Sequence, residues 1–384
     1  MLECSQSRAV LVVGAGFAGA VHARLLAEAG YEVKLIDRRR HLGGNAYDAI
    51  DGNGVRVHRY GPHLFHSKMK HVVDWLMQFD RFVSYSHRVR ALLPSGAYVP
   101  LPINRSTISA IYDRHFETSE AAETFLKSVA APIEMPSNAA EYLYSRIGVP
   151  LTNLFFRPYT KKMWDVELEA MAPNVVARIP IRFDDNDSYF RPGETQILPI
   201  AGYTRLFERM LDHPGIAINL GVKFSKGMEQ EFYCCFNSMS IDEYYDYCEG
   251  YLPYRSIRFH HSDSLDCVPR AWSVTNFTDD SPFTRETAWH VLPGHVVADT
   301  GRRTLTREEP CDFRDNADER FYPVMDSGGH NLQMYETYKA MAAENRHIKF
   351  IGRCGTYRYL DMDQVINQSL IHVRDWIRSD SRQR

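Results

Sequence analysis

The stretch AVLVVGAGFAGAVHARLLAEAGYEVKLID, residues 9–37, has the pattern of a β-α-β unit. Its first five residues form a continuous apolar run, as in a strand buried on both faces, and residues 17–29 repeat apolar side chains at helical spacing. Gly30 ends the helix, and residues 32–36 alternate as a second strand that ends at Asp37. The unit predicts an α/β fold with a parallel sheet.

The turn between strand and helix carries the pattern Gly14-x-Gly16-x-x-Gly19. The first glycine permits the tight turn, the second lets the backbone approach a pyrophosphate, and the third lets helix and strand pack closely. The helix N-terminus supplies unpaired N–H groups for phosphates, and Asp37 is placed to accept hydrogen bonds from a ribose. Strand, turn, helix, second strand and terminal acid occur together, so the motif predicts dinucleotide binding rather than an accidental glycine-rich turn.

A second glycine pair, Gly43-Gly44, follows shortly and precedes Asn45. It would let another backbone segment approach a flavin or its pyrophosphate, which NAD dehydrogenases do not usually need. An ordinary loop between strands has the same spacing, so this pair alone does not choose between FAD and NAD.

Length and composition narrow the class of protein. The chain has 384 residues, 44% of them hydrophobic and 24% charged, which indicates two or three globular domains and excludes a disordered or fibrous chain. A formal net charge of −3 gives no reason to expect nucleic-acid binding or a charge-driven membrane role. Seven cysteines without C-x-x-C spacing favour reduced thiols over zinc or disulfides. The N-terminus lacks the features of a signal peptide, and no apolar run is long enough to span a membrane, so we expect a soluble, cytoplasmic protein.

Periodicity divides the rest of the chain. Helices are predicted at 68–79, 203–211, 332–344 and 362–378, and strands at 216–220 and 347–351. Residues 105–164 read as helical, residues 81–104 and 254–310 alternate like strands, and residues 171–202 read as short extended pieces. Helical and antiparallel parts therefore stand as insertions in one α/β domain.

Several further motifs, in order, carry a specific resemblance. They are GAGFAGAV, HLGGNAYD, YGPHLFH (60–66), LPIN (101–104), PYTKKMW (158–164), ARIPIRF (177–183), YRSIRF (254–259), NFTDDSPFTR (276–285), FYPV (321–324) and GRCGTYRYLDMDQVI (352–366). Together they resemble the UDP-galactopyranose mutase family over almost the whole chain. The resemblance implies an FAD-binding Rossmann-like domain at 1–80, 203–247 and 336–384, a helical domain at 105–170, and an antiparallel-sheet substrate domain at 81–104, 171–202 and 248–335.

The resemblance also implies an isomerase, an intramolecular transferase without net redox chemistry, active in cell-wall or glycan biosynthesis. In that family the N5 atom of reduced FAD attacks the anomeric carbon of a nucleotide-activated hexopyranose, giving a flavin–sugar iminium that recloses as a furanose. The implied partners are a nucleotide-sugar substrate, most readily UDP-galactopyranose and UDP-galactofuranose, and a cellular flavin reductant. The sequence leaves the oligomeric state open, with a homodimer as one option, and no metal is implied.

The implied site residues follow by motif match. Cofactor contacts are assigned to Gly14, Gly16, Gly19, Asp37, Gly43, Gly44, Asn45, His63, Arg353, Tyr359, Asp361 and Met362. The residues assigned to catalysis are His63, Arg178, Arg285, Tyr322 and Tyr359. Substrate contacts are assigned to Phe155, Phe156, Tyr159, Trp164, Arg178, Tyr189, Arg255, Arg285, Tyr322 and Tyr357. Arginine suits a leaving diphosphate because its planar guanidinium binds phosphate bidentately, and Asn186 is expected on or near a mobile lid that shields the site from water.

Two stretches depart from the family pattern. Asn237-Ser238-Met239-Ser240 stands where the family has Tyr-Thr-Gly-Pro, and Ala288-Trp289-His290 stands where it has Glu-His-Lys. These changes leave the identity of the sugar open, so a different nucleotide-hexopyranose, such as a 6-deoxy sugar, is an alternative substrate. A flavin amine or alcohol oxidase and a catalytically dead nucleotide-sugar binder are further alternatives, and the arginine and tyrosine set argues against the oxidase.

Overall fold

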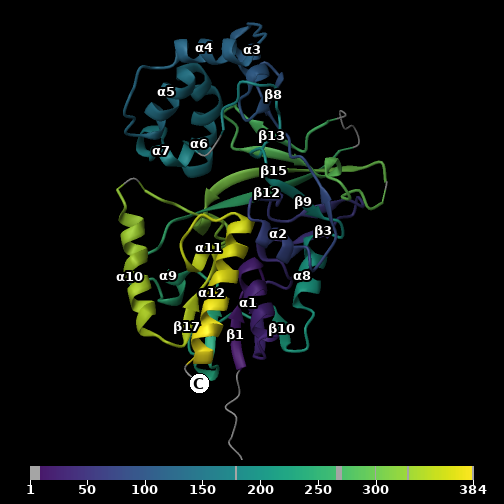
Figure 1. Ribbon diagram of the computed structural model, residues 1–384, viewed down its shortest axis with the longest axis vertical. Helices are drawn as coiled ribbons and strands as arrows, with labels where there is room; N and C mark the ends of the chain where they lie inside the picture. Colours follow the sequence, from purple (N-terminus) through teal and green to yellow (C-terminus); the bar gives the residue numbers. More distant parts are fainter. Residues whose placement is uncertain (1–8, 178–179, 265–269, 299, 327, 383–384) are drawn as a thin grey trace, which may run out of the picture.

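Three layers follow one another along the long axis of the molecule. The computed structural model describes residues 9–177, 180–264, 270–298, 300–326 and 328–382. A parallel sheet with its helices lies at the lower end in Figure 1, a large, mainly antiparallel sheet lies across the middle, and a group of helices lies at the upper end. This arrangement confirms the predicted α/β fold with a Rossmann-like part, an inserted helical part and an antiparallel sheet.

The parallel sheet has the strand order β10-β2-β1-β11-β17 among the described residues. In that order its strands are Ile216–Leu220, Glu32–Asp37, Ala9–Val13, Cys234–Asn237 and Ile348–Phe350. Both faces are buried: Val10 and Val12 lie in one hydrophobic core, and Leu11 and Val13 lie in another. The continuous apolar run of β1 follows from this double burial.

The main helices of this layer come from three parts of the chain. They are α1 (Phe17–Glu28), α2 (Lys70–Leu76), α8 (Tyr203–Leu211), α9 (Ile241–Tyr244), α10 (His330–Glu344), α11 (Gly352–Gly355) and α12 (Met362–Arg382). Helices α1, α8 and α12 contribute to the core on one face of the sheet, and α9 contributes to the core on the other. Figure 1 shows α1 and α12 side by side, and a hydrogen-bonding contact of 3.0 Å between His22 and His372 joins them.

The middle layer is a mixed sheet with the order β16-β12-β15-β14-β13-β7-β8 among the described residues. In that order its strands are Tyr322–Pro323, Tyr254–Ser264, Arg303–Asp312, Arg285–Ala288, Val274–Phe277, Val89–Leu92 and Tyr98–Leu101. Neighbouring strands are antiparallel except β13 and β7, which are parallel. The register sets Arg285 opposite Glu308 and Tyr322 opposite Arg255.

Two small antiparallel sheets connect these layers. One pairs β3 (Asp48–Ile50) with β4 (Arg56–His58), and the other has β9 (Thr195–Pro199) between β5 (Phe65–Ser67) and β6 (Phe82–Ser84). The segment between β4 and β5 contains Tyr60, Gly61 and His63, so these two sheets fix both ends of the YGPHLFH motif.

The upper layer is a helical group around its own core. Its elements are α3 (Arg105–Tyr112), α4 (Ser119–Val129), α5 (Ala139–Leu151), a short π-helix at Thr152–Phe156, α6 (Arg157–Trp164) and α7 (Pro173–Ala177). Their apolar side chains pack with Ala91 of β7 and Val99 of β8, so the helices are attached to the end of the middle sheet.

Most of the predicted elements are confirmed, including the helix 203–211 and the strand 216–220 at their exact bounds. Residues 171–202 are the exception, because they contain the helix α7 and one strand, β9. Pro173, which reads as a helix breaker, is the first residue of α7, where a missing N–H costs nothing.

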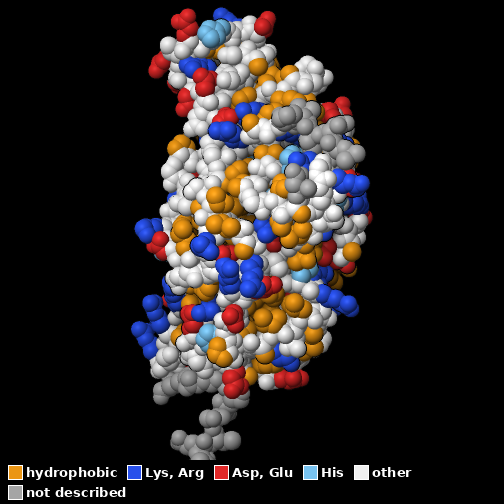
Figure 2. Space-filling model, turned by 90° about the vertical axis from the view of Figure 1, so that its right-hand side faces the viewer, with side chains coloured by type: hydrophobic (Ala, Val, Ile, Leu, Met, Phe, Trp, Pro, Cys, Tyr) orange, Lys and Arg blue, Asp and Glu red, His pale blue; other side chains and the backbone are white. Residues whose placement is uncertain are grey.

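The surface carries charges of both signs. Acidic and basic side chains are intermixed on the face shown in Figure 2, together with scattered hydrophobic side chains. Within the described residues no helix is long and apolar enough to cross a membrane. The described His, Cys, Asp and Glu side chains also form no group of three or more that could hold a metal ion. The five described cysteines are free thiols.

Candidate active site

Two glycine pairs meet beside the N-terminus of α1; we call Gly14, Gly16, Gly43 and Gly44 the glycine cradle. The Gly43 amide donates to the Ala15 carbonyl at 2.9 Å. A Cβ atom on Gly44 would lie 2.9 Å from the Cα of Gly16, and one on Gly14, whose φ is 101°, would lie 2.0 Å from the Ser238 hydroxyl oxygen. No other residue type fits at Gly14 or Gly44 without displacing its neighbours.

The cradle has unpaired backbone donors at the point where a ligand is expected. Gly16 is the N-cap of α1 and no side chain of the described residues caps this end, so the first-turn N–H groups are available to an anion. Chain order reverses between β1 and the neighbouring strand β11, and such a switch point is where α/β sheets bind dinucleotides. These features fit the pyrophosphate of a flavin or nicotinamide dinucleotide.

Asp37 ties the cradle to the end of β2. One carboxylate oxygen accepts the Ala15 N–H at 2.7 Å, and the other accepts the Arg39 N–H at 2.8 Å. An ionised carboxylate has about four acceptor sites, so two remain for the ribose contact that the sequence predicts.

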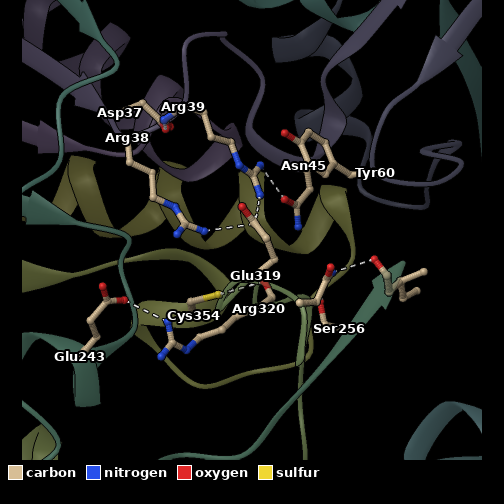
Figure 3. A network of polar contacts seen from close by, with 12 residues as sticks. Asp37, Arg38, Arg39, Asn45, Tyr60, Glu243, Ser256, Glu319, Arg320 and Cys354 are labelled. Carbon is tan, nitrogen blue, oxygen red and sulfur yellow. Dashed lines mark hydrogen bonds and ion pairs between the residues drawn. The ribbon is translucent and has the colours of Figure 1, made fainter. Parts of the chain in front are cut away.

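Arg39 follows Asp37 by two residues and belongs to a polar network beside the cradle (Figure 3). Its guanidinium lies 4.1 Å from the ring centre of Tyr60 and donates to Asn45 Oδ1 at 2.9 Å. It also donates to Glu319, whose carboxylate lies 3.1 Å from Arg38. Glu319 therefore joins the end of β2 to the segment that precedes β16.

That segment leads directly to a second group of side chains. The Phe321 carbonyl accepts from Arg353 at 3.0 Å, and the Arg353 guanidinium also donates to the Leu360 carbonyl. The same guanidinium lies 5.2 Å from the ring centre of Tyr322 and 5.3 Å from that of Tyr359. Arg353 is thus held by backbone carbonyls beside the two tyrosine rings.

Aromatic rings surround Arg353; we call Tyr159, Trp164, Arg285, Tyr322, Arg353 and Tyr359 the arginine–tyrosine cluster. The Tyr322 and Tyr359 rings are stacked with centres 5.5 Å apart, and Trp164 lies 6.3 Å from Tyr322 and 6.4 Å from Tyr359. Every member is half-buried, which suits a surface that contacts a ligand. Burial and Tyr359 raise the pKa of Tyr322 to about 12, so its hydroxyl remains a neutral donor at pH 7.

Arg285 enters the cluster from β14 and forms an ion pair with Glu308, with Nε and Oε2 2.8 Å apart. The Glu308 side chain is only 1% exposed, so this ion pair is shielded from water. Burial lowers the pKa of Arg285, but the charge of Glu308 outweighs this and the net pKa is raised. Burial raises the pKa of Tyr159, and the positive charge of Arg285 counters this in part. The pair leaves a fixed cation beside neutral phenols, which is the donor set that a diphosphate requires.

His63 lies beside both arginines of the cluster. Its Nδ1 lies 2.8 Å from the Gly61 carbonyl oxygen, and a carbonyl only accepts, so Nδ1 carries the proton and Nε2 has the free lone pair. Burial lowers its pKa to about 4, and the charges of Arg353 and Arg285 act in the same direction. His63 is therefore a neutral acceptor at pH 7.

The N-terminus of α12 is built from the DMD motif. The Asp361 N–H donates to Gln364 Oε1 at 2.9 Å, Met362 is the first helical residue and packs against the main core, and Asp363 accepts from the Ser67 hydroxyl at 2.7 Å. Ser67 is in β5, next to the YGPHLFH motif, so α12 is fixed to the His63 segment.

The structure does not bring every predicted residue to the cluster. The Tyr357 hydroxyl donates to the carbonyls of Val324 and Pro253, at 2.7 and 3.1 Å, and the residue is 1% exposed. The Tyr357 ring therefore lies in the core, an arrangement that does not favour the predicted substrate contact, which stays a prediction. Arg255 donates to the carbonyls of Met163 and Lys162, so it holds the C-terminus of α6 beside Trp164.

The remaining predicted residues lie in the helical layer or around it. Phe155 and Phe156 are each 8% exposed in the π-helix and belong to the helical core. Tyr189 donates its backbone N–H to His87 and is an electrostatic neighbour of Tyr159. The Arg182 guanidinium donates to the carbonyls of residues 186, 188 and 190, which holds the segment predicted as a lid. Gly19 is in α1, where a Cβ would meet the Gly14 carbonyl at 1.8 Å, and Arg178 lies outside the described residues.

Comparison with known proteins identifies the family. The family model "UDP-galactopyranose mutase" matches residues 154–359, and an "NAD(P)-binding Rossmann-like domain" model matches residues 12–79. A dTDP-fucopyranose mutase of Escherichia coli is 34% identical over 97% of this chain and 99% of its own length. The chain belongs to the UDP-galactopyranose mutase family.

Further relatives agree with this family assignment and with the predicted isomerase class. A protein of Klebsiella pneumoniae named "Probable UDP-galactopyranose mutase" is also 34% identical, over 97% of this chain and 96% of its own length. The crystal structure of reduced UDP-galactopyranose mutase superposes with a TM-score of 0.75 and 17% identity, covering 96% of this chain and 95% of that one, which shows the shared fold. Family membership and the Rossmann-like domain together imply a flavin cofactor.

Sequence reasoning missed Glu308, Glu319 and Arg39 as parts of the site of this mutase. Glu308 belongs to an alternating strand with several charged residues, and only the register between β14 and β15 sets it against Arg285. Glu319 is in an irregular segment with no local motif. Arg39, two residues after Asp37, carried the clearest available signal, since an arginine near the ribose acid is a familiar feature of Rossmann-like sites.

Proposed function

We propose that the protein is a flavin-dependent mutase that interconverts the pyranose and furanose forms of a nucleotide-activated hexose, with UDP-galactopyranose and UDP-galactofuranose as the substrate pair. The arginine–tyrosine cluster is the observation that carries this proposal. It presents the guanidinium of Arg285, fixed by Glu308, together with neutral phenol donors in one half-buried group, which suits a leaving nucleoside diphosphate.

The glycine cradle supports FAD as the cofactor. Backbone donors of α1 would bind the pyrophosphate, Asp37 would bind the ribose, and Asn45, Arg353, Asp361 and Met362 would lie along the bound molecule. When bound and reduced, FAD supplies a nucleophilic ring nitrogen for the anomeric carbon of the sugar.

The protein's own side chains provide binding and electrostatics in this proposal. Arg285 binds the diphosphate and stabilises the charge that grows on it as it leaves, and Tyr159, Tyr322 and Tyr359 donate hydrogen bonds to its oxygens. His63 accepts a hydrogen bond at Nε2 and holds no proton there at pH 7. Trp164 covers one side of the cluster and excludes water from the reacting sugar.

A second substrate has a specific observation behind it. The dTDP-fucopyranose mutase is as similar to this chain, at 34% identity, as the relative named for UDP-galactopyranose. A 6-deoxyhexose linked to a nucleoside diphosphate would bind to the same arginine–tyrosine cluster, because the cluster would contact the diphosphate and not the sugar.

The test is a product assay on dithionite-reduced protein with a panel of nucleotide sugars. UDP-galactofuranose should be converted to UDP-galactopyranose, resolved by chromatography. If only the pyranose and furanose forms of dTDP-fucose are interconverted, the substrate is the 6-deoxy sugar and not galactose. Failure on every nucleotide sugar, with amine- or alcohol-dependent oxygen consumption instead, would replace the mutase with a flavin oxidase.

The domain division remains part of the proposal. We infer that 1–80, 203–247 and 336–384 bind the cofactor, that 105–170 form the helical domain, and that 81–104, 171–202 and 248–335 bind the substrate. A cellular flavin reductant completes the scheme.

A further inference from the structure

Two buried histidines lie directly behind His63. His58 is the last residue of β4 and His295 follows β14 in the chain; they are 1% and 3% exposed, and their Nε2 atoms are 3.1 Å apart. They come from segments 237 positions apart in the sequence. Neither histidine belongs to the glycine cradle or to the arginine–tyrosine cluster.

The neighbouring backbone groups fix the proton positions on both rings. The His63 N–H donates to His58 Nδ1 at 3.0 Å, so Nδ1 is unprotonated and the ring proton is on Nε2. His295 Nδ1 lies 3.2 Å from the Pro293 carbonyl oxygen, which only accepts, so Nδ1 of His295 carries the proton and its Nε2 is an acceptor. The remaining contact then has one donor and one acceptor: His58 Nε2–H donates to His295 Nε2.

The result is a chain of hydrogen bonds with a single direction. It runs from the His63 N–H through His58 and His295 to the Pro293 carbonyl, and both imidazoles are neutral with opposite tautomers. Adding a proton to either ring would place two donors face to face or a donor against an N–H.

The packing around the pair leaves little room for rearrangement. The Trp289 ring centre lies 4.9 Å from that of His58 and 6.3 Å from that of His295, and Trp289 is fully buried. Trp289 belongs to the segment Ala288-Trp289-His290, which departs from the usual family motif. The Tyr203 ring packs edge-on against His58 at 5.4 Å.

The segment between His58 and His63 is equally confined. A Cβ on Gly61, whose φ is 84°, would lie 3.1 Å from the Phe259 ring and 3.2 Å from Glu308 Oε1. The backbone therefore passes close to the buried carboxylate, and the His58–His63 hydrogen bond closes the loop. His63 is also held at its ring by Gly61, so its Nε2 has a defined direction.

We propose that His58 and His295 are positioning residues for His63, which they hold through a hydrogen-bond chain of fixed direction. The proposal rests on the proposed function, in which His63 Nε2 is an acceptor at the reacting centre. The ionisable and charged groups that face the pair are Arg56 of β4, Tyr203 of α8 and His63 itself.

The tautomers provide a direct test on the unmodified holoprotein. Histidine-labelled protein is examined at pH 7.5 by two-bond ¹H–¹⁵N NMR correlation, with assignments from single histidine variants. We expect His58 to be protonated only at Nε2 and His295 only at Nδ1. A cationic ring, or His58 protonated at Nδ1, would overturn the proposal, and this outcome does not depend on any substrate.

Paired variants then test the role. His58→Asn keeps an acceptor near the position of Nδ1 for the His63 N–H, whereas His58→Leu removes it. With reduced protein and nucleotide sugar, His58→Leu should lower kcat roughly 10- to 100-fold, because small misplacements at a reacting centre cost this much, with KM nearly unchanged. His58→Asn should recover most of that loss, and His295→Gln should behave like His58→Asn because Oε1 replaces the Nε2 acceptor.

A second histidine pair is the control. His22 and His372 join α1 to α12 with ring nitrogens 3.0 Å apart, away from His63. His372→Leu should lower the melting temperature but leave kcat and the flavin absorption spectrum unchanged, whereas His58→Leu should shift that spectrum. Equal kcat for His58→Leu and His58→Asn, or an unshifted flavin spectrum in His58→Leu, would show that the pair is only structural. If no nucleotide sugar turns over while the tautomers are as stated, the proposed function fails and the hydrogen-bond chain stands.

Discussion

In the proposed function, the glycine cradle and the arginine–tyrosine cluster would bind phosphate groups in different ways. The cradle uses backbone, because glycines let two segments approach until a Cβ on Gly44 would lie 2.9 Å from Gly16. The cluster uses side chains from α6, β14, β16 and the segment after β17, and the buried Glu308 holds Arg285 among them. Backbone donors suit a cofactor that remains bound, and guanidiniums suit a charge that forms and leaves.

This difference predicts how each region fails. A change in the cradle should affect cofactor binding first, and a change in the cluster should affect turnover while the cofactor stays bound.

Arg285→Ala should have the largest effect. It removes a fixed cation from the diphosphate, so kcat/KM should fall roughly 10³-fold or more, as when a preorganised charge-stabilising donor is lost. The purified protein should remain yellow, since the cradle is untouched, and the flavin content is read from its visible absorbance. Arg314→Ala, at an exposed arginine paired with Asp312, is the matched control and should be neutral. Loss of flavin from Arg285→Ala would contradict the prediction that changes in the cluster affect turnover and not cofactor binding.

Gly44→Ala should give the reverse pattern. The residue has a φ of 54°, and its new Cβ would press against Gly16, so the cradle must open. We expect flavin affinity to fall about 10- to 100-fold, equivalent to about 1.4–2.8 kcal/mol, measured by titrating FAD into the apoprotein. Gly96→Ala is the control, because Gly96 also has a positive φ of 85° but no atom within 4 Å of the added Cβ. An equal loss in both variants would show a general loss of stability and would contradict a specific effect of the close approach in the cradle.

Lowering the pH should destabilise the protein through its buried histidines. Burial lowers the pKa of His63 and of His295 from 6.5 to about 4. As the pH falls from 6.5 towards 4, these two histidines become protonated in the unfolded chain but stay neutral in the native protein. The free energy of unfolding therefore falls in this pH window, and above pH 6.5 it does not depend on these two groups. Each group contributes about 1.4 kcal/mol per pH unit within the window. Melting temperatures from pH 4 to pH 8 measure this, and a flat profile below pH 6.5 would mean that these histidines are already charged in the native protein.

Tyr357→Phe should have the smallest effect on catalysis. The partners of its hydroxyl among the described residues are the Val324 and Pro253 carbonyls, so its loss should cost about 1 kcal/mol of stability. The value of kcat/KM should stay within about twofold, since a group that makes no transition-state contact contributes nothing to it. Tyr322→Phe is the matched substitution inside the cluster and should lower kcat/KM clearly. A large fall in kcat/KM for Tyr357→Phe would instead support a contact between Tyr357 and the substrate.

The two regions also differ in how well sequence predicts them. The cradle could be predicted because its residues are close in the chain and each glycine has a local reason, whereas the pairing of Arg285 with Glu308 depends on a register between β14 and β15 that no local pattern encodes. Tyr357 and Tyr359 share one motif, yet the backbone at Tyr357 has a φ of 46° and turns its ring into the core. The His58–His295 pair could not be predicted either, because 237 positions separate the two residues.

The most direct test of the account compares one preparation before and after reduction. The same sample is assayed with UDP-galactofuranose as purified, in its oxidised form, and again after dithionite treatment, with products separated by chromatography. The account predicts conversion to UDP-galactopyranose only after reduction, because the oxidised ring lacks the nucleophilic electron pair. Equal turnover by the oxidised protein would contradict it.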